Sequence, residues 1–368
     1  MTLLRRVLFS AVAAAGSVLA VCSANASPIT PGNLVIFRAG DGAAALGTTA
    51  APGFLDEYTT AGAFVQSIPV PAVGPTALTL VGNSTTEGVL GRSQDGTRLV
   101  FTGYRKDAGG TQPSSDAASV TNRVFGLVGL NGAVDTSNGF NDAGVTGNAR
   151  SATTVDGSFF YSGTSTGVRY VAAPGIQPST LLDNRNSRQV QLSGNTLFAS
   201  NGSTSTTNKV QNYGTLPTGA TTPTPVVVLA TADAVNGIFL ADLNAAVPGD
   251  DTLYALSTVE NLLRKYTFDG TNWTANGSVP ASSTANLTGI VSGGNVNLFL
   301  TSSSSLFNFT DSSGVNGSLS GTLSAPLATA ATNTGFRGIS TLALIPEPGT
   351  MMVFGLCAGG LLIRRRSA

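Results

Sequence analysis

Short runs in which hydrophobic and polar residues alternate dominate the chain, and they predict β-strands separated by tight turns. Alternation places every second side chain on the same face of a sheet. Asp-Gly and Gly-Asn pairs between such runs are hairpin signals. In the clearest unit, strands are expected at 150–155, 158–162, 168–171 and 177–182. The same four-strand scheme recurs, and the predicted units span 87–136, 149–182, 188–229, 235–279 and 287–323.

The spacing of these units predicts a β-propeller. First strands begin near residues 87, 149, 188, 235, 287 and 335, an interval of roughly 40 to 60 residues that is typical of propeller blades. The two ends of the body supply one more unit, because 336–344 is a lone first strand and three strands without a first follow one another at 34–39, 54–59 and 63–70. Joined, they would form a composite blade that leaves no free sheet edge.

The sequence therefore predicts an all-β fold, a β-propeller of six or seven blades closed by a composite blade from the N- and C-terminal ends of the body. The seventh blade depends on the stretch 71–86. A pair of β-sandwiches or an irregular β-solenoid is the alternative.

The first 26 residues have the order of a secretory signal peptide. Arg5 and Arg6 precede an apolar run over 7–21, and Ala24-Asn25-Ala26 has the small-x-small pattern of a cleavage site. We expect export through the general secretion machinery and cleavage after Ala26.

The C-terminal end contains three further parts in order. Pro346-Glu347-Pro348 is followed by the apolar stretch 351–363 and by Arg364, Arg365 and Arg366. The apolar stretch predicts a short transmembrane helix, and the arginines would remain cytoplasmic by the positive-inside rule. The predicted domains are a signal peptide at 1–26, a propeller-like body at 27–344 and a tail at 345–368. A plain single-pass anchor is the alternative for the tail.

This order of Pro-Glu-Pro, apolar helix and arginine cluster resembles the PEP-CTERM sorting signal of exopolysaccharide-producing Gram-negative bacteria. The resemblance implies that exosortase cleaves near Pro346-Glu347-Pro348 and supplies the catalytic residues, so Glu347 is a recognition element. It also implies that the inner membrane holds the protein transiently, with its body in the periplasm, before it reaches the cell surface or the biofilm matrix. Segments 34–42 and 336–339 are similar to an uncharacterised propeller-like class, which implies no activity.

Composition narrows the chemistry of the body. The chain has no histidine, its 19 basic and 19 acidic residues give no net charge, and both cysteines, Cys22 and Cys357, lie in the terminal segments. Ser-His and Cys-His nucleophiles are thereby excluded. The absence of a basic patch also argues against nucleic acid as a partner.

The remaining candidates are carboxylates. Asp242, Asp250 and Asp251 form a weak calcium candidate, and no other metal, cofactor or catalytic residue is predicted. We expect a non-enzymatic binding or structural role, with exopolysaccharide as a candidate partner. The alternative is a propeller hydrolase or lyase that acts on extracellular polysaccharide, with Tyr104, Arg105 and Asp107 in its central funnel.

Overall fold

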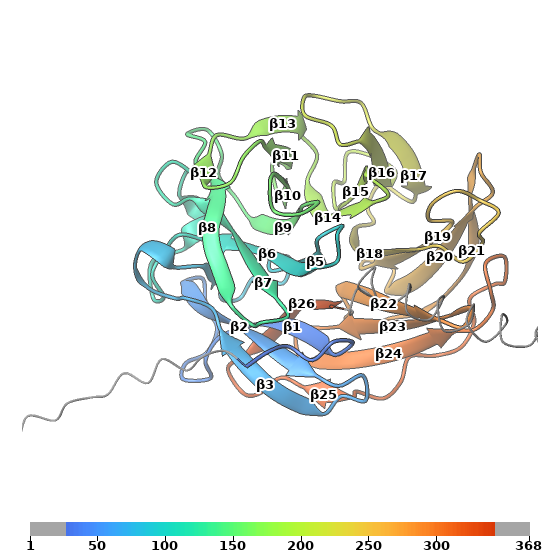
Figure 1. The fold of residues 1–368 in the computed structure, drawn as a ribbon, viewed down its shortest axis with the longest axis horizontal. Coiled ribbons are helices and arrows are strands. Elements are labelled where there is room, and N and C mark those ends of the chain that lie inside the picture. Colours follow the sequence, from blue (N-terminus) through green and yellow to red (C-terminus); the bar gives the residue numbers. More distant parts are fainter. Residues whose placement is uncertain (1–26, 343–368) are drawn as a thin grey trace, which may run out of the picture.

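A computed structural model describes residues 27–342, and these residues form an all-β body (Figure 1). Within them, helical structure is confined to two 3-10 turns, η1 (Gly74–Thr76) and η2 (Pro113–Ser115). The predicted signal peptide, which we expect to be helical, and the predicted transmembrane helix lie outside the described residues. No helix within residues 27–342 has the length and apolar character needed to cross a membrane. The all-β prediction is confirmed.

Four antiparallel sheets of four strands each are built from consecutive segments. Their strands are β9 (Ala149–Thr153), β10 (Phe160–Thr164), β11 (Gly167–Val171) and β13 (Thr180–Asp183); β14 (Ser187–Ser193), β15 (Thr196–Asn201), β16 (Asn208–Thr215) and β17 (Thr224–Val228); β18 (Val235–Ala241), β19 (Thr252–Ser257), β20 (Leu262–Phe268) and β21 (Trp273–Pro280); and β22 (Asn286–Ser292), β23 (Asn295–Thr301), β24 (Ser305–Asp311) and β25 (Ala328–Thr329).

Two more groups of four strands belong to one ten-stranded sheet. One is β5 (Gly91–Arg92), β6 (Arg98–Tyr104), β7 (Arg123–Gly129) and β8 (Val134–Phe140). The other, called the composite sheet below, is β26 (Gly335–Thr341), β1 (Leu34–Ala39), β2 (Ala50–Tyr58) and β3 (Phe64–Pro69). Strand β4 (Thr79–Val81) joins the two groups, because it pairs with both β2 and β6. In the composite sheet β26 pairs antiparallel with β1, so the two ends of the described chain share one ladder.

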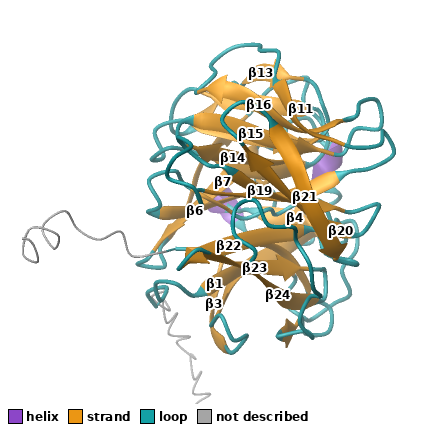
Figure 2. Ribbon diagram, turned by 90° about the vertical axis from the view of Figure 1, so that its right-hand side faces the viewer, coloured by secondary structure: helices purple, strands orange, loops and turns teal. Residues whose placement is uncertain are grey.

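The six groups surround a common axis (Figure 1). Each has its first strand innermost, and these strands contact one another around the axis in the order β5, β9, β14, β18, β22, β26 and back to β5. Strands fill the interior and loops emerge at the surface (Figure 2). The architecture is therefore propeller-like.

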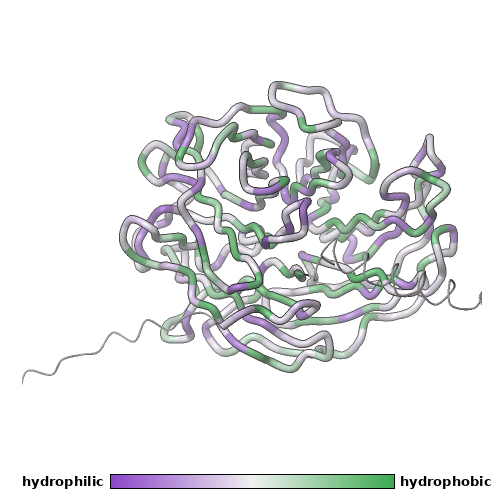
Figure 3. Tube along the Cα trace, viewed as in Figure 1, coloured by the Kyte–Doolittle hydropathy of each residue, from purple (hydrophilic) through white to green (hydrophobic). Residues whose placement is uncertain are grey.

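Apolar side chains from neighbouring sheets form the core. The hydropathy colouring alternates along the strands, as the sequence pattern predicts (Figure 3). Phe37 of the composite sheet lies 4.8 Å from Phe101 of β6 between ring centroids, and Phe125 of β7 lies 4.9 Å from Phe160 of β10. Burial of these rings away from water holds each sheet against the next.

Two predicted segments differ from the structure. The stretch 71–86 contains only η1 and β4, so it adds no further four-stranded sheet. The strand expected over 177–182 is split into β12 (Ile176–Gln177), which pairs parallel with β8 of the preceding sheet, and β13. Pro178 lies at the break, where it has no N–H to donate to a ladder.

Candidate functional site

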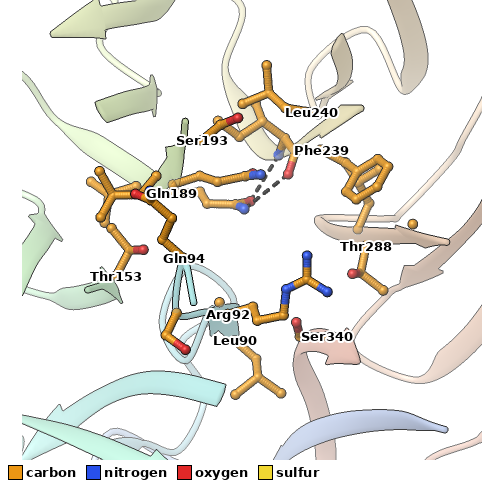
Figure 4. Close-up of a pocket in the computed structure, with 18 of the residues that line it drawn as sticks. Leu90, Arg92, Gln94, Thr153, Gln189, Ser193, Phe239, Leu240, Thr288 and Ser340 are labelled. Carbon is orange, nitrogen blue, oxygen red and sulfur yellow. Dashed lines mark hydrogen bonds between the residues drawn. The ribbon is translucent and has the colours of Figure 1, made fainter. Parts of the chain in front are cut away.

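A polar cavity of about 220 Å³ lies on the axis, between the innermost strands (Figure 4). Every innermost strand or the turn after it contributes to the wall. The lining includes Arg92 at the end of β5, Gln94 in the turn after it, Thr153 from β9, Gln189 and Ser193 from β14, Leu240 from β18, Thr288 from β22 and Thr341 from β26. Asp250, from the loop between β18 and β19, completes the rim.

One wall of the cavity is fixed by Gln189. Its Nε2 donates to the Ile238 carbonyl oxygen at 3.0 Å, and its Oε1 accepts from the Ile238 backbone N–H at 2.9 Å. This buried pair of hydrogen bonds joins β14 to β18 of the next sheet. Because an unmade hydrogen bond at a buried site is expensive, the pair keeps the two strands in register around the cavity.

Three oxygen atoms in the wall are buried and have no hydrogen-bond partner among residues 27–342. They are Gln94 Oε1, Thr153 Oγ1 and Thr341 Oγ1. The other end of the Gln94 side chain is fixed, because its Nε2 donates to Asn195 Oδ1 at 2.7 Å. Leaving a buried polar atom unpaired costs about 1–3 kcal/mol. Each oxygen has almost no solvent-accessible surface, so a ligand that offers hydroxyl donors would satisfy it only after a small movement of the cavity wall.

Two ionisable groups of opposite sign belong to the cavity. The Arg92 guanidinium extends into its centre (Figure 4) and makes no hydrogen bond or ion pair within the described part of the chain. The guanidinium is open to the cavity, yet the surrounding strands displace bulk water and lower its pKa. Asp250 accepts a hydrogen bond from Ser193 Oγ. Burial, with smaller contributions from Asp242 and Asp251, raises the pKa of Asp250 to about 6.

The calcium candidates do not assemble into a metal site. Asp251 is fully buried and accepts from the Leu243 and Asn244 backbone N–H groups, while Asp250 faces Ser193 and Asp242 is exposed. Residues 27–342 contain no group of three or more His, Cys, Asp or Glu side chains placed to hold a metal ion.

The predicted funnel residues also lie elsewhere. The Tyr104 hydroxyl donates to Glu87 Oε1 at 2.5 Å, Arg105 donates to the Ala77 carbonyl oxygen at 2.9 Å, and Asp107 accepts from the Gly74 N–H at 2.7 Å. Tyr104 ends the second strand of its group, β6, and Arg105 and Asp107 follow it, whereas the axis is lined by first strands. Their assignment to a central funnel is therefore wrong.

The other predicted site residues lie outside the described residues. They are the sorting motif at 346–348, the arginine cluster at 364–366, and Ala24 and Ala26 of the signal cleavage site. Sequence reasoning missed Arg92, Gln94 and Gln189. The signal that could have found them is their shared place at or just beyond the predicted first strands, which a ring brings to one axis.

Comparison with protein families matches residues 344–366 to the PEP-CTERM protein-sorting motif. The chain carries this motif, as its resemblance predicted. The motif implies export, sorting at the membrane and processing by exosortase, with the cell surface as the destination. No curated protein matches the chain.

Solved structures match the body at the level of the fold. A "putative 6-phosphogluconolactonase" from Bacteroides uniformis is 10% identical, with 78% of this chain and 81% of that chain covered and a TM-score of 0.47. A chain of a nidogen–laminin complex is 10% identical, with 84% and 98% covered and a TM-score of 0.47. The WD40 domain of Toxoplasma gondii coronin is 10% identical, with 83% and 66% covered and a TM-score of 0.42.

These matches correct the prediction that the chain is not an enzyme. The composition excludes histidine and cysteine nucleophiles, but the Bacteroides uniformis structure and a second from Bacteroides fragilis are both assigned to an enzyme class. The non-enzyme prediction is withdrawn. At 10% and 11% identity the likeness describes the fold and transfers no substrate.

Proposed function

We propose that the body is a closed six-bladed propeller that acts outside the cell and binds a sugar unit of an extracellular polysaccharide in its axial cavity. The composite sheet supports closure, because β26 and β1 pair there, and the ring of innermost strands supports six blades. The sorting motif supports an extracellular site of action.

The observation that carries the proposed ligand is the set of three unpartnered oxygens in the cavity wall, Gln94 Oε1, Thr153 Oγ1 and Thr341 Oγ1. A sugar presents several hydroxyl groups, each of which can donate to such an oxygen once its side chain turns toward the cavity. Small-molecule pockets usually measure roughly 300–1,000 Å³, so a cavity of about 220 Å³ suits one sugar unit or a chain end. Binding there requires no metal or cofactor.

The route to the surface belongs to the same proposal. The signal peptide at 1–26 would direct the chain to the general secretion machinery and be removed after Ala26. The tail at 345–368 would hold the body on the periplasmic side of the inner membrane until exosortase cleaves near Pro346-Glu347-Pro348. The mature protein would then reside in the exopolysaccharide matrix.

A second candidate function is acid–base chemistry on the bound sugar, as in a hydrolase or lyase. It is favoured by the raised pKa of Asp250, which allows the carboxyl to take up or release a proton near neutral pH. Arg92 in the same cavity could neutralise a sugar carboxylate during proton abstraction. Asp250 is the sole carboxylate among the lining residues, so the paired-carboxylate arrangement of most glycosidases is not supported.

A pair of isosteric variants tests the binding site. Thr153→Val removes an unpartnered cavity oxygen, and Thr102→Val removes an unpartnered buried oxygen of β6 that does not line the cavity. Neither loses a hydrogen bond, so both should unfold at the same or a higher urea concentration than the parent. A glycan array followed by calorimetry should show at least tenfold weaker sugar binding for Thr153→Val alone. Equal affinity of the two variants would refute the site.

Turnover is tested separately on the same ligand. The exported protein is incubated with the bound polysaccharide, and new reducing or unsaturated ends are measured. Products that disappear in Asp250→Asn while binding persists would establish the second candidate. Products that persist in Asp250→Asn would exclude Asp250 as the acid or base.

A further inference from the structure

A second cavity, of about 310 Å³, lies at the opposite end of the axis, where the innermost strands begin. Its wall includes Thr85, Arg188, Asn236, Asn286, Ser302 and Phe336. Arg188, Asn236, Asn286 and Phe336 are the first or second residues of β14, β18, β22 and β26. Hydroxyl and amide groups dominate this wall, and Arg188 is its one charged side chain. We call this cavity the arginine mouth.

Arg188 differs from its counterpart in the preceding sheet. Arg150 is the second residue of β9, as Arg188 is of β14. Arg150 reaches the next sheet, where its Nη1 donates to Asn186 Oδ1 at 2.7 Å and to the Ser187 carbonyl oxygen at 3.1 Å. The guanidinium of Arg188 makes no such bond to any described residue, and its buried Nε is without a partner.

Asn236 also lines the mouth, as the second residue of the next innermost strand. Its Oδ1 is also buried and lacks a partner within residues 27–342. Rotation of the Asn236 amide by a half-turn would place its NH₂ group, a hydrogen-bond donor, where Oδ1 now lies. The oxygen and nitrogen ends of an Asn amide are nearly indistinguishable in shape, so both orientations fit the same space. The arginine mouth therefore contains the Arg188 guanidinium and the Asn236 amide, both of which have hydrogen-bonding atoms without a partner within residues 27–342.

The surroundings of Arg188 are positively charged. Arg150 is buried near Arg188, and it shares the buried carboxylate of Glu87 with the buried Arg337. Burial and then the charge of Arg188 lower the pKa of Arg150 to about 9. Glu87 is already engaged by Tyr104, Asn148 and the Val81 N–H. Arg150 and Arg337 thus share one carboxylate, and an anion at the mouth would relieve the repulsion between Arg188 and Arg150.

We propose that the arginine mouth binds the carboxylate of an acidic sugar, with Arg188 as the charged donor and the surrounding hydroxyl and amide groups as partners for the sugar ring. Arginine is suited to carboxylates because its planar fork can donate two parallel hydrogen bonds. The volume of this mouth accommodates one or two sugar units. The site is separate from the axial cavity and does not rest on the function proposed there.

The first test compares two ligands on the unaltered exported protein. Calorimetry is performed with an oligogalacturonate and with the same oligomer after methyl esterification, which removes the charge and keeps the rings. The acid should bind at least tenfold more tightly than the ester, and the difference should shrink as salt is raised. Equal affinities, or no binding of the acid, would overturn the proposal.

The second test identifies the residue that is responsible for tighter binding of the acid than of the ester. Arg188→Gln should bring the acid to the affinity of the ester, whereas Arg264→Gln removes the same charge from a surface pair with Glu260 and should leave the tenfold preference intact. Thr153→Val should also leave it intact, which separates this mouth from the axial cavity. A preference that survives in Arg188→Gln would overturn the assignment. Inorganic phosphate binding more tightly than the oligogalacturonate would overturn the choice of a sugar carboxylate.

Discussion

At the scale of the residue, the axial cavity holds a carboxyl group in an unfavourable setting. Burial raises the pKa of Asp250 to about 6 from a usual value near 3.8, and the charges of Asp242 and Asp251 add to the effect. The folded protein therefore binds a proton at Asp250 more tightly than the unfolded chain does. The contribution of Asp250 to the free energy of unfolding therefore falls between about pH 4 and pH 6, because over this range the folded protein keeps a proton that the unfolded chain has lost.

Asp250→Asn should remove that fall. Asparagine keeps the shape of the protonated carboxyl, so the variant should match the parent near pH 4 and exceed it above pH 6 by about 1–2 kcal/mol. Urea unfolding at a series of pH values measures the difference. Asp269→Asn is the control, since backbone N–H groups lower the pKa of that exposed carboxyl, and it should give no gain at pH 7. A pH-independent gain for Asp250→Asn would contradict the explanation.

Local turn chemistry could be predicted from sequence, whereas the cavity residues could not. Asp95-Gly96 and Asp156-Gly157 do form turns, with Gly96 at φ 73° and Gly157 at φ 94°. Their aspartates accept from backbone N–H groups two residues later, at Thr97 and Ser158. Such contacts are encoded within four residues. The position of Arg92 on the axis depends on the five other groups of strands that surround it, and no short stretch of sequence encodes that arrangement.

At the scale of the element, β26 lies very close to the segment before β5 at Gly338. Its N–H donates to the Gly88 carbonyl oxygen of the segment before β5 at 2.9 Å. A Cβ atom added at Gly338 would lie 2.6 Å from that oxygen and closer still to the Leu90 nitrogen. Both are backbone atoms, which cannot rotate away as a side chain would.

Gly338→Ala should therefore force the two strands apart. We expect a loss of about 3 kcal/mol in the free energy of unfolding, the upper part of the range for overpacked interiors. Gly144→Ala is the matched control, because nothing lies within 4 Å of its added Cβ, and its effect should stay within about 1 kcal/mol. Chemical denaturation measures both, and equal effects would show that strand proximity at Gly338 is unimportant.

The position of most elements followed from the sequence, while some of their partners did not. First strands expected at 149, 188, 235, 287 and 335 begin at 149, 187, 235, 286 and 335. In these strands hydrophobic and polar residues alternate strongly, and turn residues lie at both ends of each strand. The first strand expected from residue 87 is only β5, Gly91–Arg92, because the segment before it bonds to other sheets through Val89 and Gly88 instead. Pairings of two- or three-residue strands such as β4 and β12 depend on what lies beside them, so alternation within the strand cannot predict them.

At the scale of the whole molecule, one ladder joins the two ends of the body. Strand β26 is buried along its whole length and pairs with β1 from Leu34–Thr341 to Ala39–Gly335. Leu342 is also buried, and its carbonyl oxygen accepts from the Gly32 N–H at 2.7 Å. The sorting motif begins at residue 344, directly after this ladder. The sequence predicted that the last strand ends just before the sorting motif, and this order is consistent with removal of the tail without loss of that strand.

Two shortened chains test whether the body folds without the tail and whether it needs β26. A chain that ends at Ile345 keeps the β1–β26 ladder, so its free energy of unfolding should equal that of the exported protein within about 1 kcal/mol. A chain that ends at Asn333 lacks β26 and exposes the edge of β1 together with the apolar side chains that Phe336 and Ile339 cover, so it should aggregate or unfold without a cooperative transition. Circular dichroism and urea unfolding measure both.

A synthetic peptide of residues 334–345 then distinguishes loss of the strand from damage to the remaining chain. Because it carries the whole β26 ladder, it should restore a cooperative transition to the chain ending at Asn333. A peptide in which Gly338 is replaced by Ala should fail, since its added Cβ meets the backbone at Leu90. If the chain ending at Asn333 unfolds like the longer one without any peptide, the fold does not depend on the strand contributed by its C-terminal end.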